Sequence, residues 1–158
     1  KIYVYRRNEQ SVSNTYRKDG DKDWMRIAQD LQDKIDSLNY EKKQYSQDEI
    51  ENYESIVAWT IYFAAFFDGK MEYEYSTGKI RAVINLLKRY ASYDLTKKYL
   101  KNPLRYTKKI PALSYKIMLG GFAFLMKCNM YVLLSLGIKL LVDCHIDERL
   151  SDTGRKED

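Results

Sequence analysis

Hydrophobic residues recur at helical spacing along most of the chain. Apolar side chains return every three or four residues over 23–40, which predicts an amphipathic helix. Ser46 and Glu49 have the spacing of a capping box ahead of a second apolar run, so we expect another helix to begin there. This second helix is predicted to end at Asp68-Gly69. Its segment 56–67 is apolar nearly all round, which favours a place in the centre of the core.

The pattern changes after this second helix. Residues 70–75 alternate between apolar and polar side chains, which predicts a loop or a short extended link. Ser76 or Thr77 is expected to cap a third helix. The helical pattern weakens after Tyr93, and Pro103 is expected to end it.

The C-terminal part is the most apolar. Pro111 is expected in the first turn of a fourth helix, because proline suits that position. Lysines divide residues 112–142 into pieces much shorter than the roughly twenty residues that a membrane-spanning helix needs. Segment 127–129 is predicted either as a turn between two helices or as the polar side of one long helix.

Together these patterns predict an all-α fold, a single compact bundle of four to six helices, with marginal β content. We expect a polar N-terminal segment over 1–22, in which residues 2–5 alternate as in one short strand. The helical bundle domain is expected over 23–148, followed by a polar tail over 149–158.

Charge is distributed unevenly. The chain has 27 Lys and Arg against 22 Asp and Glu, a formal charge of only +5. Residues 79–139 contain thirteen basic residues and one acid, Asp94, so this stretch carries +12 and the remainder −7. A charge polarity of this size indicates an anionic partner for one part of the molecule.

Candidate catalytic and metal-binding residues are few. His145, the only histidine, directly follows Cys144, and neighbouring helical side chains diverge by about 100°, which prevents joint binding of one ion. Glu72 and Glu74 alternate as a glycosidase pair would, but isolated surface acids explain them better. Gly78-Lys79 lacks the glycine spacing of a phosphate-binding loop. We therefore expect no enzyme, no metal site and no cofactor.

The two cysteines, Cys128 and Cys144, are too few for a disulfide scaffold. This favours a reducing compartment and a cytoplasmic location.

The basic stretch contains the candidate binding residues. Cations spaced along a helix and the loop after it suit a phosphate backbone, and the interleaved Tyr99 and Tyr106 have faces on which unpaired bases can stack. The candidate nucleic-acid-binding residues are Lys79, Arg81, Lys88, Arg89, Lys97, Lys98, Lys101, Arg105, Lys108 and Lys109. The main alternative pairs these cations with the acidic segments 30–54 and 143–158 of the same chain. An anionic membrane surface is the least favoured partner.

Short motifs between residues 50 and 121 also point to a family. They are Gly69-Lys70, then Ser76-Thr77-Gly78-Lys79-Ile80-Arg81 with Val83-Ile84-Asn85-Leu86-Leu87, and Ile110-x-x-Leu113-x-x-Lys116 with Gly120-Gly121. These motifs resemble the small all-helical subunit of type III CRISPR effector complexes. The resemblance implies a non-catalytic subunit stacked along a guide RNA and its target, with Lys79 and Arg81 at matching backbone-contacting positions. Phe122 stands where the family has an arginine after glycine.

A second set of residues suggests a different family. Ile27-Ala28-Gln29-Asp30-Leu31, with Asp36 and Leu38, is similar to the death-motif helix of pro-apoptotic proteins of the Bcl family. Asp68-Gly69 with the segment 78–80 is similar to a degenerate form of that family's glycine signature. Lys34 and Ile35 depart from the motif, as do Lys88 and Arg89 in the helix that follows.

The sequence thus supports two hypotheses. The first is a non-catalytic helical subunit that binds the backbone of guide or target RNA inside a larger ribonucleoprotein complex, in contact with other protein subunits. The alternative is a helical protein-interaction module of the Bcl or membrane-associating type. It would bind a partner helix or a membrane through an apolar groove or the surface of residues 117–141.

Overall fold

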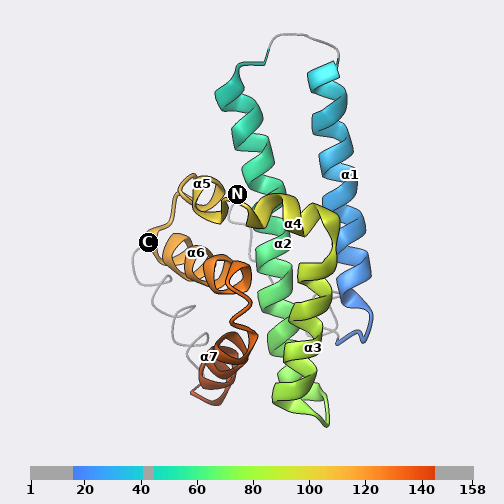
Figure 1. Cartoon of the computed structure of the whole chain (residues 1–158), viewed down its shortest axis with the longest axis vertical. Helices are drawn as coiled ribbons and strands as arrows, with labels where there is room; N and C mark the ends of the chain where they lie inside the picture. The colour runs from blue at the N-terminus through green and yellow to red at the C-terminus, as the bar shows by residue number, and fades with distance from the viewer. Residues whose placement is uncertain (1–15, 41–44, 145–158) are drawn as a thin grey trace, which may run out of the picture.

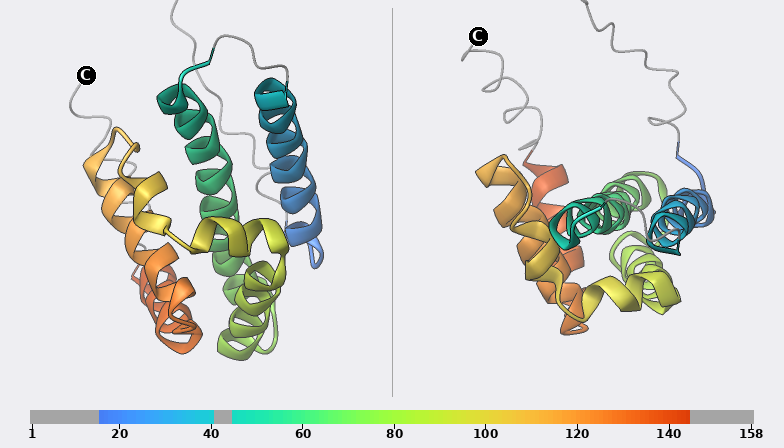
Figure 2. Two further views of the ribbon diagram at one scale, coloured as in Figure 1. Left: turned by 45° about the horizontal axis from the view of Figure 1, so that its top comes forward. Right: turned by 90° about the horizontal axis from the view of Figure 1, so that it is seen from above.

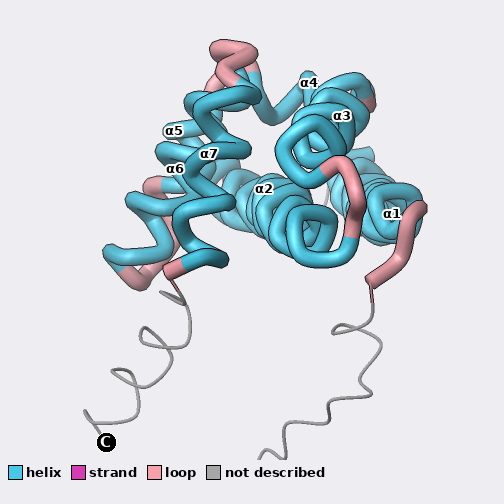
Figure 3. Tube along the Cα trace, turned by 90° about the horizontal axis from the view of Figure 1, so that it is seen from below, coloured by secondary structure: helices cyan, strands magenta, loops and turns pink. Residues whose placement is uncertain are grey.

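Seven helices form the described part of the chain, which covers residues 16–40 and 45–144 of the computed structural model (Figure 1). They are α1 (Gly20–Tyr40), α2 (Gln47–Tyr75), α3 (Lys79–Ser92), α4 (Asp94–Leu100), α5 (Pro103–Thr107), α6 (Leu113–Lys127) and α7 (Tyr131–Asp143). No strand occurs within these ranges (Figure 3). The all-α prediction is confirmed, but the predicted four to six helices are too few. The expected strand at 2–5, the tail 149–158 and His145 lie outside the described residues.

The long helix α2 is the centre of the architecture. It packs against each of the other six helices. Seen along its axis, α2 has α1 on one side and the α6–α7 pair on the opposite side, while α3 packs along a third side (Figures 2 and 3). This confirms the expectation that the apolar segment 56–67 lies in the core: Val57, Ile61 and Ala65 are at most 1% exposed.

Helix α2 begins as predicted but ends later. Ser46 and Glu49 form both hydrogen bonds of the capping box. The predicted end at Asp68-Gly69 is wrong, and residues 70–75 are helical rather than an extended link. Gly69 serves close packing instead, because a Cβ there would lie 2.8 Å from Cδ1 of Ile138 on α7. The missing side chain therefore lets α7 approach α2.

Helix α3 presents the predicted apolar face to the core, with Val83 and Leu87 fully buried. The predicted cap is wrong. Gly78 is the N-cap and makes no side-chain bond, whereas Ser76 ends α2 by donating its backbone N–H to the carbonyl of Glu72 at 3.0 Å.

The segment after Tyr93 forms two short helices, which accounts for the extra elements. Pro103 begins α5 instead of ending α3, since proline fits the first turn of a helix. Pro111 precedes α6, which begins at Leu113 and not at the proline as predicted. Residues 128–130 form a turn in which Asn129 has φ 57°, so the two-helix interpretation of this region is confirmed.

Three buried tyrosines anchor the core polar contacts. The Tyr62 hydroxyl donates to the carbonyl of Tyr99 at 3.0 Å, and the Tyr99 hydroxyl donates to Oε1 of Gln32. Tyr90 donates to Oδ2 of Asp68 at 2.5 Å. Burial raises the pKa of all three phenols well above the ordinary value, so they act as neutral donors.

Candidate functional site

Half of the ten candidate cations form ion pairs inside the molecule. Lys98, Arg105 and Lys109 pair with Glu54, Glu51 and Asp48 of α2, at 3.4, 3.2 and 2.6 Å. These acids are spaced three residues apart, so they follow one side of α2. Lys97 pairs with Asp94 at 2.8 Å, and Arg89 pairs with Asp21. The alternative in which acids of segment 30–54 pair with the basic stretch is therefore realised for three cations.

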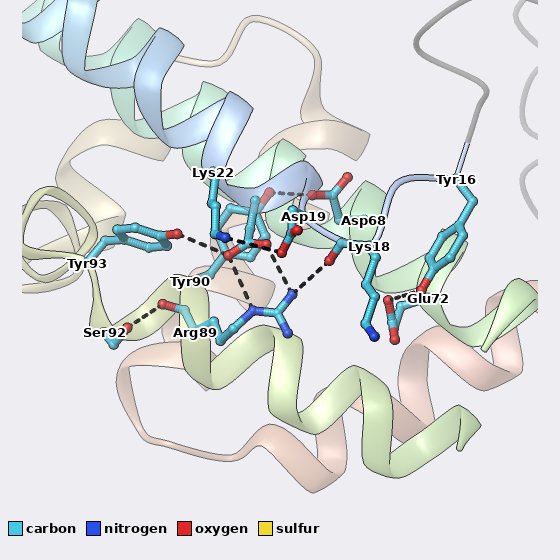
Figure 4. Close-up of polar contacts among 11 residues, drawn as sticks. Tyr16, Lys18, Asp19, Lys22, Asp68, Glu72, Arg89, Tyr90, Ser92 and Tyr93 are labelled. Atoms are coloured by element: carbon cyan, nitrogen blue, oxygen red, sulfur yellow. Dashed lines mark hydrogen bonds and ion pairs between the residues drawn. The ribbon is translucent and has the colours of Figure 1, made fainter. Parts of the chain in front are cut away.

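Arg89 has a structural partner that the sequence did not reveal. α1 begins at Gly20, three residues before the predicted start, so Asp21 lies in its first turn and is only 1% exposed. Arg89 donates from Nε and Nη2 to the two carboxylate oxygens of Asp21, at 3.3 and 3.0 Å, and Tyr93 donates to Asp21 at 3.0 Å (Figure 4). This network attaches the start of α1 to the end of α3.

Asp68 lies beside this network and is partly buried (Figure 4). Burial raises the pKa of its carboxyl to about 6, and the nearby charge of Asp21 adds to the rise. The hydrogen bonds from Tyr90 and Trp24 oppose it. A Cβ at Gly20 would lie 3.3 Å from Oδ2 of Asp68, so the first turn of α1 lies directly on this carboxyl group.

The interleaved tyrosines do not face solvent. Tyr99 is fully buried and Tyr106 is 7% exposed, and their rings meet edge to face with centroids 4.9 Å apart. Trp59 donates its indole N–H to the carbonyl of Tyr106 at 3.0 Å. The expectation that these two rings stack on unpaired bases is therefore wrong, because both belong to the core.

The other candidate cations have no acidic partner within 4.0 Å among the described residues. They are Lys79, Arg81, Lys88, Lys101 and Lys108. Arg81 and Lys88 are exposed on α3 two turns apart, so they share the face that is opposite the buried one. The Lys79 ammonium lies 5.1 Å from the ring centroid of Tyr73. The structure thus leaves a smaller and more scattered set of available cations than the sequence predicted.

The largest feature that sequence reasoning did not resolve is an apolar surface on α6 and α7. Nine large apolar side chains of this region are 43–67% exposed, namely Leu113, Tyr115, Ile117, Phe124, Met130, Val132, Leu133, Leu136 and Leu140. Several of them follow helical spacing, as in Leu113 and Ile117 on α6 and in Leu133, Leu136 and Leu140 on α7, whereas Tyr115 lies on the opposite side of α6 from Leu113 and Ile117. We call these nine residues the α6–α7 surface.

Two glycines lie within these helices without an internal packing role. A Cβ at Gly121 or Gly137 would meet no atom within 4 Å. Glycine in a helix interior costs about 1 kcal/mol relative to alanine, and internal packing here gives no compensation. This differs from Gly69 and from Gly120, where a Cβ would lie 3.2 Å from Oγ1 of Thr107.

The residues considered for catalysis are not arranged as a catalytic site. Glu72 and Glu74 lie on α2 two residues apart, on different sides of the helix, and Glu72 accepts a hydrogen bond from Tyr16 at 2.9 Å. Cys128 and Cys144 are exposed thiols. Within residues 16–40 and 45–144, no group of three or more His, Cys, Asp or Glu side chains could hold a metal ion.

Comparisons with protein families, with curated proteins and with solved structures found no match for this chain. Among the described helices, none combines the length and apolar character needed to cross a membrane.

Proposed function

We propose that this protein is a non-catalytic helical subunit that binds a partner protein through the α6–α7 surface. The observation that supports this function is the exposure of nine large apolar side chains on two consecutive helices. Exposed apolar patches of this kind mark interaction sites in soluble proteins.

The charges around this surface indicate the chemistry of the partner. Residues 113–142 contain no acid and three lysines, Lys116, Lys127 and Lys139. A partner helix with an apolar stripe and acidic flanks would complement this surface. Gly121 and Gly137 suit such a partner, because positions without a side chain let a second helix approach closely.

A membrane is the weaker occupant. Stable membrane attachment of an apolar face usually needs a second, polybasic signal. Of the three lysines, Lys139 is paired with Asp143, and Lys127 donates to the carbonyl of Lys101 at 2.8 Å. Lys116 and Lys127 therefore keep charges without an acidic partner among the described residues, and two separate cations are fewer than a polybasic signal needs.

Photocrosslinking and quantitative binding test this function together. A photoreactive phenylalanine analogue at Leu136 should crosslink the partner, and the purified partner should then bind the chain in solution. Leu136→Asp should weaken that binding at least 30-fold, the effect of a central interface residue. Ile27→Asp on α1 is the matched control, because Leu136 and Ile27 are both 43% exposed.

Three results would contradict the proposal. They are equal loss of binding in the two variants, self-association of the chain at the same surface, and flotation of the chain with anionic vesicles that Leu136→Asp abolishes.

A second function, contact with an RNA backbone, is supported by the cations without an ion pair. Arg81 and Lys88 share an exposed face of α3, and Arg81 is also one of the two positions that the resemblance to type III CRISPR small subunits selects. Charge reversal at both should weaken binding to single-stranded RNA, measured by fluorescence anisotropy. The affinity of the unchanged chain should fall steeply with salt, because phosphate contacts release counterions. Salt-insensitive binding would contradict RNA contact.

A further inference from the structure

A shallow cleft of about 300 Å³ lies where the end of α4 meets the turn between α6 and α7. Three lysines line it: Lys97 on α4, Lys101 directly after α4, and Lys127 on α6. Its apolar wall includes Leu100, Met126 and Tyr131. The cleft therefore combines a cationic rim with an apolar floor, and no acidic residue lines it.

Two hydrogen-bond acceptors of the cleft already receive a hydrogen bond from the protein. The carbonyl of Lys101 accepts from Nζ of Lys127 at 2.8 Å, and Oδ1 of Asn129 accepts from the Tyr131 hydroxyl at 2.8 Å. Each of these two acceptors thus has a donor from the protein. Among the lining side chains, the polar groups that remain are mainly donors: the amide N–H groups of Asn129, the remaining N–H groups of Lys127 and the ammonium of Lys101.

The charges favour an anion at the same place. Lys101 has no acidic partner within 4.0 Å among the described residues. Lys127 uses one of its three N–H donors on a neutral carbonyl. Lys97 is bonded to Asp94, which is a rim residue of a different cleft between α1 and α4. At least two positive charges therefore face a ligand in the cleft without local compensation.

We infer that this cleft binds the nucleoside monophosphate unit, with its phosphate on Lys101 and Lys127 and its base against Tyr131 and the apolar floor. Phosphate fits the excess of donors, since its oxygens are strong acceptors. A base fits the wall, because aromatic side chains stack on bases without regard to sequence. The volume is near the lower limit of ordinary small-ligand sites.

Two sources can supply this unit: a free mononucleotide or a nucleotide within a single-stranded RNA. The inference rests on the RNA contact proposed above only in the second case. It is independent of the partner protein on the α6–α7 surface.

An NMR titration of the full chain tests the site. The probes are AMP, adenosine, inorganic phosphate and a single-stranded RNA 12-mer. AMP should shift the amide signals of residues 97–101 and 126–131, and adenosine or phosphate alone should bind at least roughly tenfold more weakly, because each lacks one half of the recognition. Lys101→Gln should weaken AMP binding roughly tenfold. Lys34→Gln, at an exposed lysine on α1 that belongs to neither proposed binding surface, should leave AMP binding unchanged.

The titration with the RNA 12-mer distinguishes the proposed RNA contact through α3 from the proposed nucleotide-binding cleft. If Lys101→Gln weakens both AMP and RNA binding, the cleft belongs to an RNA path. AMP binding without RNA binding supports the cleft and overturns the RNA function. RNA binding that falls with the Arg81 and Lys88 variants but not with Lys101→Gln excludes RNA as the source of the unit. If AMP also fails to bind, the cleft is overturned while the RNA function stands. Equal loss of AMP binding in the Lys34 and Lys101 variants, or AMP-induced shifts that lie mainly outside residues 97–101 and 126–131, would also overturn it.

Discussion

The two sides of α2 differ in the kind of side chain they contain and in whether these side chains have partners within the protein. On the side of α1 and α3, buried polar groups are paired: Asp21 holds Arg89 and Tyr93, and Asp68 accepts from Tyr90. On the other side, α6 and α7 bury one face and expose large apolar side chains on the rest. On the polar side, hydrogen bonds and an ion pair join the helices to one another, whereas the apolar side has large apolar side chains exposed to solvent.

The sharpest test of this difference compares two neighbouring leucines on α7. Leu134 is 5% exposed and Leu133 is 48% exposed. Leu134→Ala should lower the free energy of unfolding by roughly 3 to 4 kcal/mol, because it leaves a cavity between α7 and the core. Leu133→Ala should change it by no more than about 0.5 kcal/mol, measured by urea denaturation. A large loss at Leu133 would show that the exposed stripe contributes to folding and is not reserved for a partner.

On the polar side, the corresponding pair is Arg89 and Lys88. Arg89→Ala strips the buried Asp21 carboxylate of its cation, which should cost roughly 2 to 3 kcal/mol after allowance for the partly exposed guanidinium. Lys88→Ala should be nearly neutral. The double variant Asp21→Ala/Arg89→Ala should lose less than the two single losses combined, since no charge is left unpaired. Simple additivity in thermal or urea unfolding would mean that Asp21 and Arg89 do not interact.

The Asp68 carboxyl makes the polar side sensitive to pH. Its pKa of about 6 lies above the ordinary value, so the folded chain binds a proton more tightly than the unfolded chain between about pH 4 and 6. Stability from this group is present below pH 4 and is lost as the pH rises through 6. Asp68→Asn keeps an acceptor for Tyr90 and should add about 1 kcal/mol at pH 7.5, allowing for solvent at its exposed edge. The gain should vanish near pH 4; a gain independent of pH would exclude titration of Asp68 as its cause.

The smallest change in the free energy of unfolding is expected for the ion pairs between the basic stretch and α2. Lys98 pairs with Glu54 at 3.4 Å and lies 5.2 Å from the ring centroid of Tyr99, but its side chain is 42% exposed. Lys98→Gln should therefore change the free energy of unfolding by no more than about 0.5 kcal/mol. The difference should shrink in 1 M salt, where surface charges are screened. A larger change that persists in salt would place this ion pair among the contacts that hold the fold.

Local signals in the sequence predicted a good part of the fold. The capping box at Ser46 and Glu49 and the buried face of α3 follow from local spacing, and each is present. The sequence left a turn or one long helix open at 127–129, and the structure has a turn at 128–130. Glycine and proline misled the interpretation where their role depends on distant residues. Gly69 was expected to end a helix, but it makes room for Ile138, which lies sixty-nine residues further along the chain.

The candidate site was predicted less well, because charge composition does not say which ions meet. Asp48, Glu51 and Glu54 are far in sequence from Lys109, Arg105 and Lys98, and they pair because α4 and α5 pack against α2 in the fold. For the apolar stretch 112–142, the sequence likewise did not show which side chains are buried and which are exposed. When a helix is apolar nearly all round, periodicity cannot tell which face is buried.

By itself the sequence determined that the chain is helical, that α2 is central and that the basic charge is concentrated between residues 79 and 139. These properties follow from local periodicity, capping and composition, which act over one or two helical turns. Only the tertiary structure decided which cations are paired, which tyrosines belong to the core and which leucines of α7 face outward. Those outcomes depend on how distant helices pack, and the three-dimensional arrangement alone specifies that.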